Sequence, residues 1–262
     1  MSDIDRPERV SPLVAFLAAV QFLLISPAFI RRPFTAKELG ASVGYYPLVG
    51  ALLGGLLIGA DWLLGQFFPV TVRSALVLAT WVFLTGALHL DGFLDACDGL
   101  LGGFTPEQRL EIMRDERVGA YALSGGILLL LTQFSALSSL GSARQAALLL
   151  APVLGRWGIT LALIASPYAR QSGLGRQIKD NAHRPQLWLA ISFTLIAGFV
   201  AAWIFEPLTI LAVLVVASLT LFGVMHFALQ RIPGLTGDIY GALNMLIETS
   251  VLLSFVVAQG LI

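Results

Sequence analysis

Repeated apolar runs, each about as long as a membrane is thick, constrain this chain more than any other feature of its sequence. A helix needs about 20 mainly apolar residues to cross the hydrocarbon core. No stretch alternates apolar and polar residues for long enough to suggest a membrane barrel. The sequence therefore predicts an all-α, polytopic integral membrane bundle of about seven or eight transmembrane helices. The candidate runs are 12–30, 43–66, 70–88, 119–140, 145–165, 187–205, 207–230 and 240–260.

Composition supports this class and excludes several others. Apolar residues make up 57% of the 262 residues and charged residues only 12%, against about 25% charged in soluble domains. The formal net charge is zero, and no basic stripe of the kind that binds nucleic acid is present. The single cysteine, Cys97, excludes an internal disulfide and a cysteine-rich zinc site. Without an internal repeat, we expect one domain over residues 1–262.

The first run, 12–30, allows two interpretations. The residues before it lack the positive segment and cleavage site of a signal peptide. We therefore expect a retained helix, bent near Pro27, that either spans the membrane or lies in its interface. Small residues spaced four apart in the second run, Gly50/Gly54 and Gly55/Gly59, predict close helix packing.

The connections between the runs differ strongly in length. Long polar loops at 31–42, 89–118, 166–186 and 231–239 alternate with very short turns, which places all four long loops on one face. Basic residues are concentrated in cytoplasmic loops of membrane proteins. We therefore expect this face to be the cytoplasmic side of an inner membrane, to contain short helices, and to carry any chemistry. It holds eleven of the sixteen basic residues: Arg31, Arg32, Lys37, Arg109, Arg114, Arg117, Arg170, Arg176, Lys179, Arg184 and Arg231.

Three carboxylates follow directly on an apolar run. If the helix of run 70–88 continues past the membrane, Asp91, Asp95 and Asp98 fall at i, i+4 and i+7 on one face. Like charges at this spacing repel unless a cation offsets them. Hard oxygen ligands on one face suit Mg²⁺ or Mn²⁺, which typically take one or two carboxylates plus phosphate oxygens. Gly92 and Gly99 would leave room for a ligand. The competing interpretation is a solvated helix end.

The same loop contains a second polar segment. Thr105-Pro106-Glu107-Gln108 is a capping box, which predicts a short helix over 106–117. Its last turn reads Arg114-Asp115-Glu116-Arg117. The arginines suit phosphates, and Asp115 could add a ligand. The alternative is an interfacial helix with a solvated charged face.

Further polar residues lie in or near the later spans. Arg156 sits inside a span, where it needs either a structural acidic partner or a phosphate. Arg170 belongs to a basic loop that could hold phosphates or anionic lipid headgroups. Asp238 is either an N-cap or part of a site. Asn244 and Glu248 lie deeper in the last run, where an unpaired carboxylate is costly.

Taken together, carboxylates for a divalent cation and arginines for phosphates on one face indicate phosphoryl-type transfer, in which positioning and charge stabilisation carry most of the catalysis. The chain contains neither the P-loop pattern G-x-x-x-x-G-K-[ST] nor the G-x-S-x-G elbow. Both a P-loop ATPase and a serine hydrolase of that type are therefore disfavoured.

Several blocks of the sequence resemble the cobalamin synthase, or adenosylcobinamide-GDP ribazoletransferase, family. The most specific are GALHLDGFLDACDGLLGG, from residue 86, and RLEIMRDERVGAYA, from residue 109. GRW, PYAR with GLG, GLTGD and GALN follow in order. The matching blocks run from about residue 44 to residue 250.

The resemblance implies transfer of the adenosylcobinamide-phosphate group of adenosylcobinamide-GDP to α-ribazole or its 5′-phosphate. GMP is released and Mg²⁺ is required. The metal ligands and catalytic residues would be Asp91, Asp95 and Asp98, with Asp115 as a further catalytic candidate. The substrate-binding candidates are Arg114, Arg117, Arg156, Arg170, Asp238 and Asn244. Contacts with a second copy or with enzymes of the pathway are left open.

Two other functions remain alternatives. A CDP-alcohol phosphotransferase also places Asp-Gly pairs on membrane helices, but its usual D-x-x-D-G-x-x-A-R pattern differs from the D-x-x-x-D-x-x-D spacing found here. An ion-coupled transporter would explain Arg156 and Glu248. It explains poorly why polar residues gather on one face.

Overall fold

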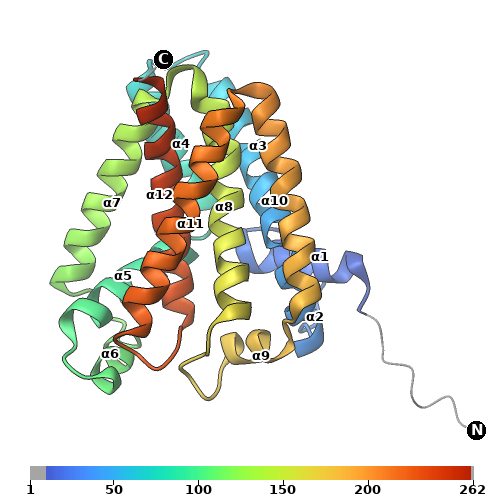
Figure 1. The fold of residues 1–262 in the computed structure, drawn as a ribbon, viewed down its shortest axis with the longest axis vertical. Helices are drawn as coiled ribbons and strands as arrows, with labels where there is room; N and C mark the ends of the chain where they lie inside the picture. The colour runs from blue at the N-terminus through green and yellow to red at the C-terminus, as the bar shows by residue number, and fades with distance from the viewer. Residues whose placement is uncertain (1–9, 261–262) are drawn as a thin grey trace, which may run out of the picture.

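The chain forms one helical bundle, which a computed structural model describes for residues 10–260 (Figure 1). Long helices run alongside one another, and shorter ones cover one end of the bundle. Two short 3-10 turns lie at Val43–Tyr45 and Gly141–Ala143. The α-helices are α1 (Pro12–Leu23), α2 (Ala36–Ser42), α3 (Tyr46–Leu64), α4 (Val70–Leu84), α5 (Leu88–Gly102), α6 (Pro106–Ile112), α7 (Ala120–Ser139), α8 (Arg144–Ala165), α9 (Leu174–Asn181), α10 (Arg184–Ile204), α11 (Pro207–Leu229) and α12 (Gly237–Gln259).

Within residues 10–260, six helical stretches are long and apolar enough to cross a membrane. The bent pair α4 and α5 makes a seventh if it is counted as one span. The polytopic helical bundle is therefore confirmed, at the lower end of the expected number of spans. The six stretches are 36–64, 120–139, 141–165, 184–204, 207–229 and 237–259.

The prediction of one helix over 12–30 is wrong. Helix α1 has 12 residues, about 18 Å of helix, which is shorter than the hydrocarbon core. The chain after Leu23 is irregular, and Pro27, which lacks an amide N–H, lies in this irregular part. The side chain of Gln21 fixes this irregular segment, because its Oε1 accepts a hydrogen bond from the backbone N–H of Ile30 at 2.8 Å. Helix α1 packs against α2 near α9 (Figure 1), which fits the interfacial alternative.

Helix α8 forms the centre of the bundle, where it packs against α3, α10 and α12. Gly50 and Gly54 permit the α3 contact, because a Cβ at either position would lie within 3 Å of the α8 backbone. The predicted close packing is thus confirmed for this pair. It is wrong for Gly55 and Gly59, since an added Cβ at either would meet no atom of the described chain within 4 Å.

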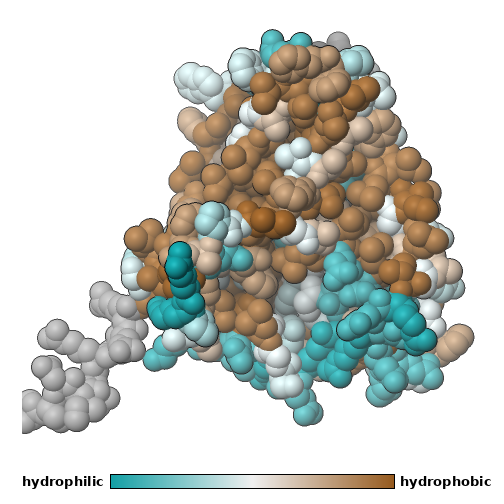
Figure 2. All heavy atoms as spheres, turned by 180° about the vertical axis from the view of Figure 1, so that it is seen from behind, coloured by the Kyte–Doolittle hydropathy of each residue, from teal (hydrophilic) through white to brown (hydrophobic). Residues whose placement is uncertain are grey.

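Hydrophobic side chains cover most of the height of the bundle, and hydrophilic side chains gather at one end (Figure 2). Helices α2, α6 and α9 lie at this polar end, whereas the C-terminus lies at the other (Figure 1). The expectation that the long loops share one face is confirmed. The membrane-crossing part of the chain therefore presents its polar loops to one side of the bilayer.

The helix of run 70–88 does not continue into the aspartates, as the sequence suggested. It stops at Leu84, and α5 starts at Leu88 at an angle of 88° to α4. Gly86 and Ala87 form the corner with positive φ angles of 58° and 56°, a conformation that glycine tolerates and alanine resists. The backbone N–H of Ile25 donates a hydrogen bond to the carbonyl of Leu84 at 2.8 Å. This carbonyl, at the C-terminal end of α4, therefore has a partner. This corner turns α5 across the polar end of the bundle.

Candidate active site

Helix α5 carries three aspartates whose surroundings differ. Asp98 accepts hydrogen bonds from the backbone N–H groups of Gly119 at 2.6 Å and Ala122 at 2.9 Å. It therefore caps the first turn of α7 from a neighbouring helix, a favourable place for a negative charge. Within the described chain, the carboxylates of Asp91 and Asp95 have no hydrogen-bond or ion-pair partner. Two of the three predicted ligands are therefore free to bind something else.

The segment after α6 lies against this aspartate stripe. A cavity of about 240 Å³ is lined by Asp91, Asp95 and Asp98 together with Arg114, Asp115 and Arg117. The structure thus brings these six predicted site residues together. Helix α6 itself ends at Ile112, so the expected helix over 106–117 is too long, and Arg114 to Arg117 occupy a loop.

The carboxylate of Asp115 is engaged by its neighbour. Arg117 Nη2 donates to Asp115 Oδ2 at 2.6 Å, and the backbone N–H of Arg117 donates to Oδ1 at 3.0 Å. These hydrogen bonds favour the charged form and lower the pKa of Asp115 to about 2. A carboxylate with so low a pKa is a weak base, which argues against Asp115 as the proton acceptor.

A second cavity, of about 320 Å³, lies on the other side of Asp91. Asp91 lines both cavities, and the second is also lined by Arg170 and Asp238. Arg170 Nη2 donates to Asp238 Oδ2 at 2.7 Å, and each side chain retains less than a fifth of its exposure. Thr236 Oγ1 also donates to Asp238, at 3.2 Å. Asp91 therefore stands at the boundary of two cavities lined by predicted site residues.

Backbone pairing brings the loops of the second cavity together. The amide of Ala169 bonds to the carbonyl of Leu235, and the amide of Leu235 bonds to the carbonyl of Pro167, both at 2.9 Å. A Cβ at Gly234 would lie 2.8 Å from the Ala169 nitrogen, so this contact needs glycine. The pairing places PYAR and GLTGD, two blocks far apart in sequence, next to each other.

The glycines Gly92 and Gly99 of α5 permit close packing with neighbouring parts of the chain. A Cβ on Gly92 would lie 3.1 Å from the backbone of Asp238, and one on Gly99 would lie 2.4 Å from the Met113 side chain. Gly241 of α12 is in equally close contact with Gly92. The expectation of room for a ligand is therefore wrong for Gly99, where Met113 fills the space. Gly92 lines the second cavity, so for this glycine the expectation stays a prediction.

Arg156 and Asn244 lie apart from both cavities, whose linings do not include them. Arg156 Nη1 donates to Glu248 Oε1 at 2.6 Å and to Asn244 Oδ1 at 3.4 Å. Arg156 is fully buried and Glu248 is 2% exposed. A structural pair with an intramembrane acid was one of the two interpretations of Arg156. The predicted substrate contacts of Arg156 and Asn244 stay predictions, and their placement argues against them.

A divalent cation fits the first cavity in its donor chemistry. Among residues 10–260, no three His, Cys, Asp or Glu side chains are arranged to hold a metal on their own. Magnesium, however, is usually bound through one or two carboxylates plus substrate phosphates. Asp91 and Asp95 lie one helical turn apart, and neither carboxylate has a hydrogen-bond or ion-pair partner in the described chain. They supply the hard oxygen donors that such a shared site needs.

The sequence missed part of the second cavity. His89, which lies nearly opposite the aspartate stripe by helical phase, is 4% exposed and lines this cavity, as do Tyr46 and Tyr240. The tight turn at Gly173, where φ is 106°, also lies there. His89 and Gly173 belong to sequence blocks that resemble the family, whereas nothing in the sequence singled out Tyr46 or Tyr240.

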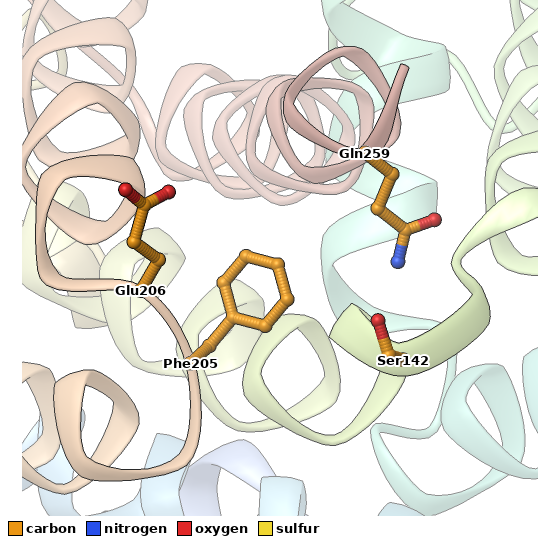
Figure 3. Close-up of a pocket in the computed structure, with 4 residues that line it drawn as sticks. All are labelled: Ser142, Phe205, Glu206 and Gln259. Atoms are coloured by element: carbon orange, nitrogen blue, oxygen red, sulfur yellow. The ribbon is translucent and has the colours of Figure 1, made fainter. Parts of the chain in front are cut away.

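A hollow of about 550 Å³ at the opposite end of the bundle offers no comparable chemistry (Figure 3). It is lined by Ser142, Phe205, Glu206 and Gln259. Glu206 accepts from the Thr209 hydroxyl, and Gln259 donates to the Leu140 carbonyl. Glu206 is the one ionisable residue in this lining. The catalytic candidates therefore belong to the polar end.

These features define a class: a polytopic membrane protein with a carboxylate- and arginine-lined site at one polar end. The model of the family described as Cobalamin-5-phosphate synthase matches residues 15–256, and the chain belongs to this family. It is 39% identical over 249 residues to an Adenosylcobinamide-GDP ribazoletransferase of Pseudomonas syringae pv. syringae, covering 92% of this chain and 98% of the relative.

Further relatives carry the same description. One from Stutzerimonas stutzeri is 38% identical, covering 95% of this chain and 100% of the relative. Another, from Desulforamulus reducens, is 39% identical, covering 92% and 95%. No solved structure matches the chain. These matches do not favour the CDP-alcohol phosphotransferase or the ion-coupled transporter.

Proposed function

We propose that this chain is a membrane-bound adenosylcobinamide-GDP ribazoletransferase. It would join the adenosylcobinamide-phosphate group to α-ribazole, or to its 5′-phosphate, and release GMP in cobalamin synthesis. Family membership over residues 15–256 supports this reaction. The observation that carries the proposal is that Asp91 separates two cavities, since a transferase with two substrates needs two sites that meet at the reacting phosphorus.

The first cavity suits the pyrophosphate of the GDP group. Arg114 and Arg117 border it, and the guanidinium fork matches phosphate oxygens. Asp91 and Asp95 would hold Mg²⁺, which when bound offsets the charge on the phosphate oxygens and the leaving GMP. Asp98 would contribute mainly by fixing the start of α7. The cavity therefore combines cationic and metal-binding groups for a diphosphate.

The second cavity suits the incoming nucleoside. A ribose hydroxyl of α-ribazole attacks the phosphorus that carries the cobinamide; the new P–O bond forms and the P–O bond to GMP breaks. The hydroxyl proton needs an acceptor near Asp91, the residue that both cavities share. Asp91 or Asp95 serves better than Asp115, whose pKa is held at about 2 by Arg117.

The polar end faces the cytoplasm in this proposal. The long loops at that end hold eleven of the sixteen basic residues, and cytoplasmic loops are enriched in Lys and Arg. In a bacterial cell the protein would then lie in the inner membrane with its site open to cytoplasmic nucleotides. A cysteine introduced at Gln108, in a variant lacking Cys97, should resist an impermeant thiol reagent in intact cells and react after lysis.

The deciding experiment measures GMP release by detergent-solubilised protein. The protein is given adenosylcobinamide-GDP and α-ribazole, with Mg²⁺ and then with EDTA. We expect GMP only when both substrates and the metal are present. The Asp95→Asn variant should lose at least about 100-fold in rate, because it removes a carboxylate that faces the phosphates.

Asp180→Asn is a matched control. Asp180 is an acid at the same end, paired with Arg176 at 2.8 Å on exposed α9, and it lines neither cavity. This variant should keep wild-type activity. A folded wild-type protein that releases no GMP would refute the transferase proposal. Full activity of Asp95→Asn, or activity in EDTA, would instead refute the assigned metal site.

A further inference from the structure

The inner part of the second cavity is built from aromatic pairs. The rings of Phe22 and Tyr46 stack with centroids 6.2 Å apart and an interplanar angle of 26°. Those of Tyr168 and Tyr240 stack at 6.3 Å and 27°. All four residues line the cavity of about 320 Å³. Four segments far apart in sequence thus bring two aromatic pairs to the lining of one cavity.

Four buried polar atoms of residues that line this cavity have no partner in the described chain. They are His89 Nδ1, Tyr46 Oη, Tyr240 Oη and Arg170 Nε, and the first three residues are 4%, 1% and 6% exposed. A buried polar group without a hydrogen bond is costly, so almost all such groups in proteins are paired. Four of them in the lining of one cavity indicate a ligand that completes their hydrogen bonds.

The lining also restricts the chemistry of that ligand. Arg170 is the one Lys or Arg among the described residues of this lining, and Asp238 at 2.7 Å offsets its charge. Leu23, Ile159 and Leu163 supply the apolar surface. Stacked rings, apolar contacts and a few neutral donors or acceptors suit a flat, uncharged aromatic ring with ring nitrogens.

We propose that this cavity binds the aromatic base of the nucleoside substrate, with Tyr240 Oη and His89 hydrogen-bonding to its ring nitrogen or ribose. This inference rests on the proposed function and adds a subsite to it. A volume of about 320 Å³ is at the small end for ligand sites. It fits a base with its sugar and is too small for a corrinoid macrocycle. A nucleoside seated here turns its ribose towards Asp91, on the boundary with the phosphate cavity.

The test is the binding of α-ribazole to the full-length, detergent-solubilised protein by titration calorimetry, without the GDP substrate. We expect Tyr240→Phe and His89→Leu each to weaken binding at least about tenfold. In the activity assay, KM for α-ribazole should rise by a similar factor, while KM for adenosylcobinamide-GDP stays unchanged. Tyr240→Phe removes a single hydroxyl, so it remains informative if His89→Leu does not fold.

Tyr45→Phe is the matched control. Tyr45 neighbours Tyr46, but its ring packs on Phe16 and Phe193 and does not line the cavity. This variant should bind α-ribazole as the wild type does. Unchanged α-ribazole affinity in Tyr240→Phe and His89→Leu, in protein that still releases GMP, would overturn the subsite and leave the transferase intact. Tyr240-dependent binding without GMP release would support the subsite and refute the transferase.

Discussion

Two arginine–carboxylate pairs anchor α12, and they differ in what surrounds them. Arg156–Glu248 joins α8 to α12 at 2.6 Å inside the bundle, with side-chain exposures of 0% and 2%. Arg170–Asp238 joins a loop to the start of α12 at 2.7 Å, with exposures of 19% and 17%. The first pair lines neither of the two cavities at the polar end, whereas both members of the second line one of them.

The comparison shows that the same chemical pair can serve the fold or the site. In the membrane interior, an unpaired charge is expensive, so each partner mainly neutralises the other. At the cavity, the remaining donors of Arg170 and the remaining lone pairs of Asp238 can still reach a substrate. Because it is partly exposed in a cavity that Asp91 also lines, we propose the second pair as the functional one.

The largest expected effect comes from breaking the buried pair. Glu248→Gln removes the negative charge but keeps the shape of the side chain, leaving Arg156 charged and unpaired. We expect a loss of about 3–5 kcal/mol in the free energy of unfolding. The measurement is equilibrium unfolding in mixed micelles with increasing SDS.

The control replaces both partners. Arg156→Met with Glu248→Met removes both charges, and replacing a buried pair by apolar residues is often neutral or stabilising. The double variant should recover most of the loss of Glu248→Gln. If Glu248→Gln alone unfolds like the wild type, the pair does not hold α8 to α12 as described, and the contrast with Arg170–Asp238 fails.

The next largest effect is expected from breaking the pair at the cavity. Arg170→Ala and Asp238→Asn should each lower kcat/KM for GMP release about 100-fold, or about 2.7 kcal/mol of transition-state stabilisation. Stability should change by no more than about 1 kcal/mol, because the pair is partly solvated. A large loss of stability with unchanged kcat/KM in the folded fraction would make this pair structural too and remove the distinction.

A smaller effect on stability should distinguish Asp98 from Asp95 on α5. Asp98→Asn should cost about 1 kcal/mol of stability, since it weakens the cap on α7 formed with Gly119 and Ala122. Asp95→Asn should leave stability unchanged or raise it, because it relieves repulsion with Asp91. Unfolding curves of the two variants, measured side by side, check this order. The reverse order would show that Asp98 is not the structural member of the stripe.

The smallest effect concerns the exposed pair at the mouth of the first cavity. Asp115→Asn should change the rate of GMP release less than about threefold at neutral pH, since the low pKa of Asp115 makes it a poor proton acceptor. Because Arg117 lowers the pKa of Asp115, the pair contributes to the stability of the folded protein above about pH 4. This contribution is lost as pH falls towards 2. Rate profiles of both proteins between pH 5 and pH 8 should therefore be parallel. A loss of the acidic limb of the profile in Asp115→Asn would identify Asp115 as the base.

Much of the fold was predictable because a bilayer sets the length of its helices. Apolar runs located six of the spans within a few residues, and loop lengths placed the polar connections on one face. The prediction for run 12–30 failed because Pro27 was expected only to bend the helix, whereas the helix ends at Leu23 and the chain around Pro27 is irregular. The corner at Gly86 and Ala87 carried no clear signal, since alanine rarely adopts a positive φ.

For the site, the sequence by itself determined the candidates: the spacing of Asp91, Asp95 and Asp98, and the arginines of the neighbouring loops. Only the tertiary structure decided which of the candidate residues are held by other parts of the chain and which are not. It used Asp98 as a cap, paired Arg156 with Glu248 across 92 residues, and set Arg170 against Asp238 across 68. Local spacing fixes the face of a helix, whereas partners depend on how distant helices pack, and packing is what leaves some charges neutralised and others free to bind substrate.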